Sequence, residues 1–177
     1  GSVFILGSYQ DPLYPEIYDD NPVPTVTRTE FKGTVSGHWD GGLFAANNVK
    51  WGADALEGPL EASLSEVTIE PGGLWENHSE GLPDTITAQT GAEVRVTDYG
   101  TLRGTALAAS DGTSVEVTVG RGGVWAIGDG NRTGTAAAAY AVDQASLTVG
   151  VEAGGEFSGS VLSKGGATAD VNNSGVW

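Results

Sequence analysis

Three glutamates and one arginine are the residues whose types and spacing could carry chemistry in this chain. Glu66, Glu93 and Glu116 each precede a glycine by seven residues in successive copies of an internal repeat, and Arg95 follows the middle glutamate by two. Carboxylates gathered on neighbouring strands, with a Lys or Arg beside them, are the groups that acid–base cleavage of a glycosidic bond requires. All four side chains alternate out of phase with the apolar residues of their segments. We therefore expect them to face solvent, where a solvated surface is the simpler interpretation.

Other candidates for catalysis or metal binding are weak. The two histidines, His38 and His78, have no metal-type partner one helical turn away and no nucleophile motif beside them, so we interpret them as surface residues. Asp111-Gly112 and Asp129-Gly130-Asn131 faintly resemble calcium loops, but they lack the spacing and the terminal Glu of such loops, and turns explain them better. The sequence therefore predicts no catalytic residue, no metal site and no cofactor.

A repeat built around a glycine must position the charged residues. This glycine recurs at Gly73, Gly100, Gly123, Gly155 and Gly175. A large apolar residue follows each glycine by two positions: Trp75, Leu102, Trp125, Phe157 and Trp177. A β-branched residue precedes each glycine by four positions: Ile69, Val96, Val119, Val151 and Val171. Apolar residues that alternate with polar ones predict a strand with one buried face, and the glycine predicts a corner that needs a positive φ or a tight bend.

The spacing between copies predicts how the units pack. Successive glycines are 27, 23, 32 and 20 residues apart, which is the range of solenoid repeats. A single strand and corner cannot close a core, so the units are expected to stack as a parallel β-helix, with equivalent residues in columns about 4.8 Å apart. In that stack Glu66, Glu93 and Glu116 would form one row of like charges. A β-sandwich of repeated hairpins is the alternative, but the repeat lacks the Asn-Gly pairs that hairpins prefer.

Composition divides the chain into two parts. Residues 1–61 are expected to form an irregular lead-in and N-terminal cap, and residues 62–177 to form parallel β-helix coils that are truncated at the C-terminus. Prolines and acidic residues alternate in the lead-in with Tyr9, Tyr14 and Tyr18. These tyrosines either cover the open edge of the first coil or form a tyrosine-rich contact surface.

The end of the lead-in holds a partial copy of the repeat. Phe44 follows Gly42 by the expected two residues, although no valine register precedes it. This pattern is consistent with one degenerate coil in residues 31–61, whose register the sequence leaves open. Insertions follow Trp75 and Trp125, and loops of this kind are where solenoids usually bind their partners.

Net charge and residue content restrict the class of protein and of partner. The 177 residues include 28 glycines, 23 Asp plus Glu and eight Lys plus Arg, with a formal net charge of −15. Abundant glycine predicts an all-β fold with many turns, and the negative charge argues against a nucleic-acid partner. No basic amphipathic segment and no apolar run of about twenty residues occurs, so we expect no membrane contact. Cysteine is absent, which excludes disulfides and thiolate chemistry.

Three segments carry a resemblance to a known family: residues 117–125, 147–157 and 169–177. In each of them a strand leads through a glycine corner to an aromatic residue. Over residues 62–177 this repeat style resembles the passenger domains of Gram-negative autotransporters of the pertactin and diffuse-adherence adhesin type. The resemblance implies a right-handed parallel β-helix that is secreted or displayed on the extracellular face of the outer membrane. It also implies adhesion to a host surface protein or glycan, or association with copies of the same chain.

Two functions of different classes remain open from the sequence. The first is a surface adhesin or self-associating stalk, whose candidate ligand-binding residues are Tyr9, Tyr14, Tyr18, Glu66, Glu93, Arg95 and Glu116. The second is a polysaccharide-acting hydrolase or lyase on a parallel β-helix, for which the sequence offers no recognisable acid–base pair. A groove with convergent carboxylates would distinguish the enzyme from the adhesin.

Overall fold

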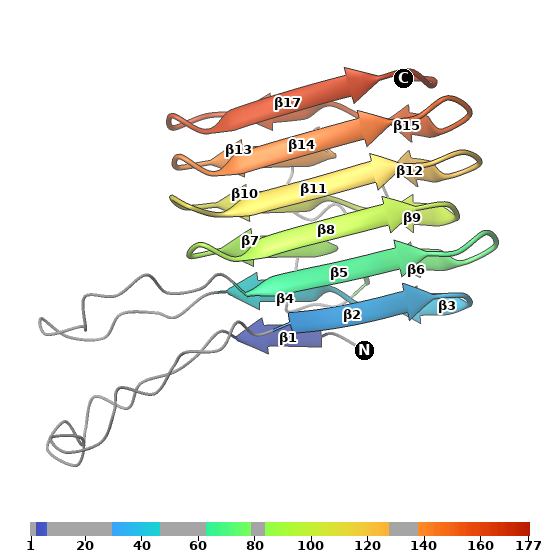
Figure 1. Ribbon diagram of the computed structural model, residues 1–177, viewed down its shortest axis with the longest axis horizontal. Helices are drawn as coiled ribbons and strands as arrows, with labels where there is room; N and C mark the ends of the chain where they lie inside the picture. Colours follow the sequence, from blue (N-terminus) through green and yellow to red (C-terminus); the bar gives the residue numbers. More distant parts are fainter. Residues whose placement is uncertain (1–2, 7–29, 47–62, 79–83, 128–137) are drawn as a thin grey trace, which may run out of the picture.

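The computed structural model describes residues 3–6, 30–46, 63–78, 84–127 and 138–177, and every regular element in these ranges is a β-strand. The strands form three sheets in which all paired neighbours are parallel (Figure 1). Sheet A contains β1 (Val3–Leu6), β4 (Leu43–Ala46), β7 (Ile86–Gln89), β10 (Ala106–Ala109), β13 (Ala139–Val142) and β16 (Val161–Ser163). Sheet B contains β2 (Glu30–Val35), β5 (Leu64–Ile69), β8 (Glu93–Asp98), β11 (Ser114–Val119), β14 (Ser146–Val151) and β17 (Thr168–Asn173). Sheet C contains β3 (His38–Asp40), β6 (Leu74–Glu76), β9 (Thr101–Arg103), β12 (Val124–Ala126) and β15 (Glu156–Ser158).

Each sheet takes every third strand of the chain, so one strand each from sheets B, C and A makes up a coil. The first coil is β2–β4, the second β5–β7, the third β8–β10, the fourth β11–β13 and the fifth β14–β16, and β17 begins a sixth. Figure 1 shows these coils stacked from β2 to β17. The prediction of an all-β fold built from stacked parallel strands is confirmed.

Residues at every second strand position form the buried core. In sheet B the row Val67, Val96, Val117 and Val149 runs through four coils, and each of these valines is at most 2% exposed. The inward positions of sheet A are small or aliphatic: Leu43, Ala45, Ile86, Ala88, Ala106, Ala108, Ala139 and Ala141. Side chains of the three sheets belong to one hydrophobic cluster, so the alternation in each strand builds a single core.

Sheet C carries the column of large apolar side chains that the repeat predicted. Trp39, Trp75, Leu102, Trp125 and Phe157 are register partners in consecutive coils. The Trp39 and Trp75 rings stack with centroids 4.4 Å apart, and those of Trp125 and Phe157 lie 4.8 Å apart with a tilt of 50°. These contacts make the column a continuous aromatic and aliphatic part of the core.

Indole N–H groups tie the tryptophans of this column to the preceding coil. Each indole donates to the carbonyl oxygen of the glycine that follows the previous sheet C strand: Trp75 to Gly41 at 2.8 Å, Trp125 to Gly104 at 3.0 Å and Trp177 to Gly159 at 2.9 Å. The side chains of Leu102 and Phe157 have no N–H to donate, and the residues at the preceding corners are Asn77 and Ile127 instead of glycine. The hydrogen bonds satisfy polar groups that the packed column would otherwise leave unpaired.

The corner of the third coil, between β8 and β9, is two residues shorter than the repeat predicted. Asp98 pairs with Ile69 and Val119, the row in which Val96 was expected. Asp98 Oδ1 accepts a hydrogen bond from the Gly100 N–H at 2.8 Å, which closes a shorter corner. Because a shift of two residues leaves every side chain on the same face, Val96 remains buried although its predicted row is wrong.

The last described corner is short in the same way. Asn173 Oδ1 accepts a hydrogen bond from the Gly175 N–H at 3.0 Å, and Asn173 pairs with Val151. Val171 was expected to pair with Val151 and instead lies two residues before that position. Asp98 and Asn173 therefore close equivalent corners, one with a carboxylate and one with an amide.

The longer corners use two glycines for different purposes. In the fourth coil Gly122 has a φ of 84°, in the left-handed region, whereas Gly123 has no positive φ. A Cβ atom on Gly123 would lie 2.1 Å from the carbonyl oxygen of Asp98 in the coil below. The recurring glycine is thus required by the close approach of two backbones, and the glycine before it supplies the expected positive φ.

Residues 30–46 form a coil within the same three sheets. Trp39, two residues after Gly37, pairs with Trp75 and occupies the sheet C column. Phe44, two residues after Gly42, lies on β4 in sheet A, where it pairs with Thr87. Gly37 and not Gly42 therefore sets the register that the sequence left open.

Candidate functional site

The candidate ligand-binding residues of the repeat lie on the outer face of sheet B. Glu66 is on β5, Glu93 and Arg95 are on β8, and Glu116 is on β11. Their side chains are between 23% and 52% exposed, as the alternation predicted. The remaining candidates, Tyr9, Tyr14 and Tyr18, lie outside the described residues.

Four charged residues form one row across this face, which we call the charged row. Its members are register partners on β2, β5, β8 and β11: Lys32, Glu66, Arg95 and Glu116. Glu93 lies in the adjacent row, so the prediction of three stacked glutamates is wrong. The cause is the short corner at Asp98, which shifts β8 by two residues and brings Arg95 between the two glutamates.

Ion pairs join each member of the charged row to the next. Lys32 Nζ lies 2.9 Å from Glu66 Oε2, and Arg95 lies 3.9 Å from carboxylate oxygens of both Glu66 and Glu116. Arg95 also donates a hydrogen bond to Glu93 in the adjacent row. The hydrogen bond to Glu66 and its negative charge raise the pKa of Lys32. The expected repulsion between like charges is thus replaced by attraction between alternating ones.

A second charged group, which the sequence did not predict, lies on the outer face of sheet C. His38 Nε2 lies 2.9 Å from Glu76 Oε1, and His78 Nδ1 lies 3.2 Å from Asp40 Oδ1. Arg103 Nη1 lies 3.7 Å from Glu76 Oε2. Asp40 and Glu76 are register partners on β3 and β6, so two carboxylates converge here. We call these five residues the histidine–carboxylate cluster.

Solvent reaches most of the histidine–carboxylate cluster. The His38 and His78 side chains are each 55% exposed, whereas that of Glu76 is 16% exposed. A hydrogen bond from the backbone of His78 holds the pKa of Asp40 below its ordinary value. Among the described residues, no group of three or more His, Asp or Glu side chains is placed to hold a metal ion. The cluster can therefore bind a polar partner, and it offers one pair of neighbouring carboxylates.

The signal for this cluster is present in the sequence but depends on the correct alignment. Matching Trp39 with Trp75 places Asp40 opposite Glu76. Matching Gly42 with the repeat glycines hides that pair. Tryptophans are the better marker here because the column they occupy has one position per coil, whereas corner lengths vary.

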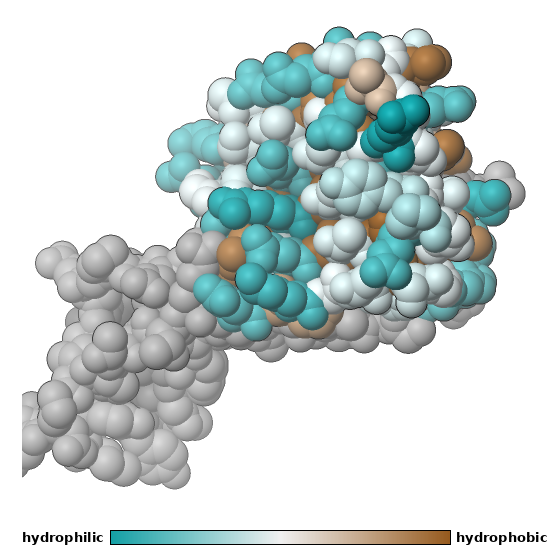
Figure 2. Space-filling model, turned by 45° about the vertical axis from the view of Figure 1, so that its right-hand side comes forward, coloured by the Kyte–Doolittle hydropathy of each residue, from teal (hydrophilic) through white to brown (hydrophobic). Residues whose placement is uncertain are grey.

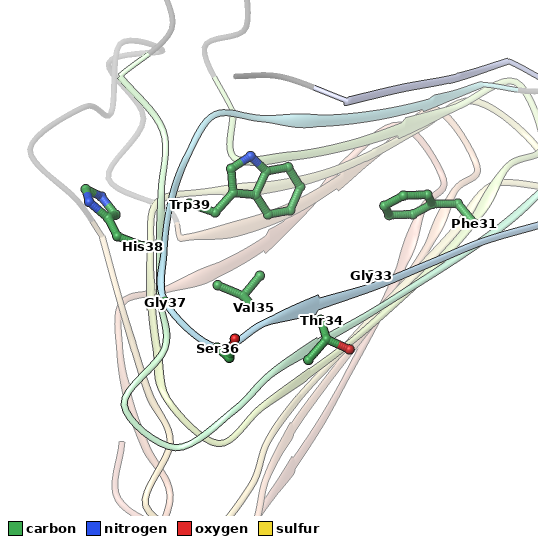
Figure 3. A pocket seen from close by; sticks show the side chains of 8 residues that line it. All are labelled: Phe31, Gly33, Thr34, Val35, Ser36, Gly37, His38 and Trp39. Atoms are coloured by element: carbon green, nitrogen blue, oxygen red, sulfur yellow. The ribbon is translucent and has the colours of Figure 1, made fainter.

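A cavity of about 300 Å³ lies at the first coil, beside β2 and β3, the terminal strands of sheets B and C in the described part of the chain. Figure 3 shows Phe31, Val35 and Trp39 on the inner side of the chain and His38 on its outer side. The other lining residues are Gly33, Thr34, Ser36 and Gly37. None of the described residues that line this cavity is a carboxylate, so among them the cavity and the convergent acids do not coincide.

Asp84 is a buried acid that joins three consecutive coils. Its Oδ1 accepts hydrogen bonds from the Thr105 hydroxyl at 2.6 Å and the Tyr140 hydroxyl at 2.8 Å. Its backbone carbonyl accepts a further bond from Asn77 at 2.9 Å. Burial raises the pKa of Asp84, although the hydrogen bonds from the two hydroxyl groups act in the opposite direction. This network holds the entry to β7 in place, and its partners are all neutral groups.

Hydrophilic residues are spread over the face seen in Figure 2, with hydrophobic residues scattered between them. None of the elements in the described ranges is a helix with the length and apolar character needed to cross a membrane. Comparison of the chain with models of protein families, with curated proteins and with solved structures gave no match. Its function therefore has to be inferred from the stack and its outer faces.

Proposed function

We propose that this chain is part of an autotransporter passenger domain, a right-handed parallel β-helix secreted to or displayed on the bacterial cell surface, where it acts as an adhesin or a self-associating stalk. The three parallel sheets support this fold. Its partner is a host surface protein, a glycan or a second copy of the chain. The outer faces support such a role because they present several charged side chains at regular spacing to an extended partner.

The observation that carries the proposal is the order of charges in the charged row. From β2 to β11 the signs are positive, negative, positive and negative. When the order of the row is reversed, every position carries a charge opposite to that of the original row. A second copy laid antiparallel on sheet B, with a two-fold axis between β5 and β8, sets Glu66 against Arg95 of the second copy and Lys32 against Glu116 of the second copy.

The rows on either side fit the same two-fold axis. One consists of threonine in all four strands, so threonine would face threonine: Thr34, Thr68, Thr97 and Thr118. In the other row Glu93 would face the position of Leu64, whose side chain is only 7% exposed, and Glu30 would face Ser114. No like charges meet between the β2–β11 faces of the two copies. For a chain with a net charge of −15, this makes sheet B a suitable surface for self-association.

Charge reversal tests this arrangement by sedimentation. Arg95→Glu and Glu66→Arg should each be monomeric, because each places like charges opposite one another at the centre of the interface. An equimolar mixture of the two variants should form dimers, since every facing pair is then of opposite sign. Arg121→Glu is the matched control: it makes the same charge change at an exposed corner and should associate like the parent protein.

The same proteins separate the two halves of the proposal. A parent protein that stays monomeric at all concentrations, or a mixture that does not associate, contradicts self-association through sheet B. Beads coated with the parent protein then test adhesion to cultured host cells and to immobilised glycans. Binding to cells or glycans would support the adhesin role even without self-association. No binding in any of these assays would contradict both roles.

A polysaccharide-acting hydrolase or lyase is the second candidate function. The convergence of Asp40 and Glu76 on neighbouring strands is the observation that favours it. We expect no release of reducing ends or unsaturated products from polygalacturonate, because both carboxylates are paired with histidines and none of the described residues lining the cavity is a carboxylate. Turnover that disappears in Glu76→Gln and persists in Glu116→Gln would establish the enzyme instead.

A further inference from the structure

Asp98 is a carboxylate buried in the hydrophobic core of the stack. Its exposed fraction is 0%, and its row neighbours are Ile69 of β5 and Val119 of β11. Its Oδ1 accepts the Gly100 N–H, and its Oδ2 has no hydrogen-bond partner among the described residues. An ionised group in such a place is costly because burial removes its hydration and no counter-charge among the described residues replaces it.

No charged side chain faces Asp98 from the strands packed against it. The titratable groups at the corners that follow β5, β8 and β11 are exposed: Glu70, Tyr99 and Arg121. The members of the charged row on these three strands, Glu66, Arg95 and Glu116, alternate with the buried positions and lie on the outer face. Burial therefore dominates and raises the pKa of Asp98 to about 6, although the hydrogen bond from the Gly100 backbone acts in the opposite direction.

The corner that Asp98 closes also supports the coil above it. The backbone carbonyl of Asp98 accepts a hydrogen bond from the Gly120 N–H at 2.8 Å. The same oxygen is the atom that a Cβ on Gly123 would meet most closely. A movement of Asp98 therefore affects the corners of both the third and the fourth coil.

We propose that Asp98 is a proton-operated latch, which holds the corner of the third coil closed when its carboxyl group binds a proton and lets it open locally when the group is ionised. Between the ordinary pKa of 3.8 and about 6, the closed corner keeps a proton that the open corner releases. The closed state consequently loses stability as pH rises through this range and is most stable in acid. This latch is independent of the proposed function.

Amide hydrogen exchange of the parent protein tests the latch directly. After correction for intrinsic exchange, the opening constant at Gly100 and Gly120 should rise roughly twentyfold between pH 4.5 and 7. The Gly175 amide provides an internal comparison, because Asn173 closes that corner with a neutral amide and its opening should not follow the same titration. Equal opening constants at Gly100 at the two pH values would overturn the proposal.

Asp98→Asn provides the second test. The amide keeps the corner-closing hydrogen bond, as Asn173 does, and removes the titrating group. The pH dependence at Gly120 should disappear in this variant and persist in Asp170→Asn, which removes an exposed acid from β17. Persistence of the dependence in Asp98→Asn would overturn the proposal. If that variant does not fold, the comparison of the two corners within the parent protein decides the question.

Discussion

Gly123→Ala should lower the free energy of unfolding by about 3 kcal/mol or more, although it adds a single methyl group. The added Cβ would lie 2.1 Å from the Asp98 carbonyl oxygen and 3.1 Å from that of Gly120, and both are backbone atoms that cannot rotate away. To make room, the fourth coil would have to move off the third, weakening the parallel pairing on either side of the corner. Urea denaturation of parent and variant measures the loss.

Gly37→Ala is the matched control for this prediction. Gly37 occupies the equivalent corner of the first coil, and a Cβ there would meet no atom of the described residues within 4 Å. Its replacement should change stability by less than about 0.5 kcal/mol. Similar losses in the two variants would show that conformational preference, and not the close approach of stacked corners, makes these glycines necessary. Gly128, in the insertion after Trp125, lies outside the described residues and is less suitable as a comparison.

Trp125→Ala should cost about 3–5 kcal/mol, the largest effect expected from truncating one side chain of the core. The Trp125 side chain is fully buried, its ring lies 4.8 Å from that of Phe157, and its indole donates to Gly104. Alanine would leave a cavity in the middle of the column and an acceptor without its donor. Thermal and urea unfolding measure the change, and a loss below about 1 kcal/mol would contradict the internal placement of the ring.

Trp125→Phe separates packing from hydrogen bonding at this position. Phenylalanine already occupies the column at Phe157, so it fits the geometry of sheet C, but it cannot donate to Gly104. We expect a loss of about 1–2 kcal/mol, mainly from the unpaired carbonyl group and the smaller ring. A loss as large as that of Trp125→Ala would show that the hydrogen bond, and not the volume of the ring, dominates.

The fold could be predicted largely because its two strongest signals are local. Alternation with a period of two marks the buried face of each strand, and a large apolar residue after a glycine marks the next inward position. Both signals survive errors in alignment: Val96 was assigned to the wrong row and is still buried. The column through Trp75, Leu102, Trp125 and Phe157 was predicted correctly for the same reason. Trp177, which was expected inside the same column, packs edge-on against Phe157 but is 49% exposed.

The outer face could not be predicted in the same way, because it depends on the length of each corner. The glycine alignment assumed equal corners, but Asp98 closes its corner two residues early through a side-chain hydrogen bond. That shift replaced the expected row of glutamates by a row in which Arg95 separates Glu66 and Glu116. The histidine–carboxylate cluster was missed for a related reason, since Gly42 was taken as the corner in place of Gly37.

The indole hydrogen bonds of the sheet C column have a consequence for how such a chain changes over time. A tryptophan in one coil depends on a glycine 34, 21 or 18 residues earlier, at the corner of the coil before it. Where the column holds leucine or phenylalanine, that corner holds asparagine or isoleucine. The two positions should therefore covary among related sequences: loss of the tryptophan releases the glycine to mutate, and a bulkier corner residue selects against the tryptophan. Selection in this stack should thus act jointly on pairs of residues that belong to adjacent coils.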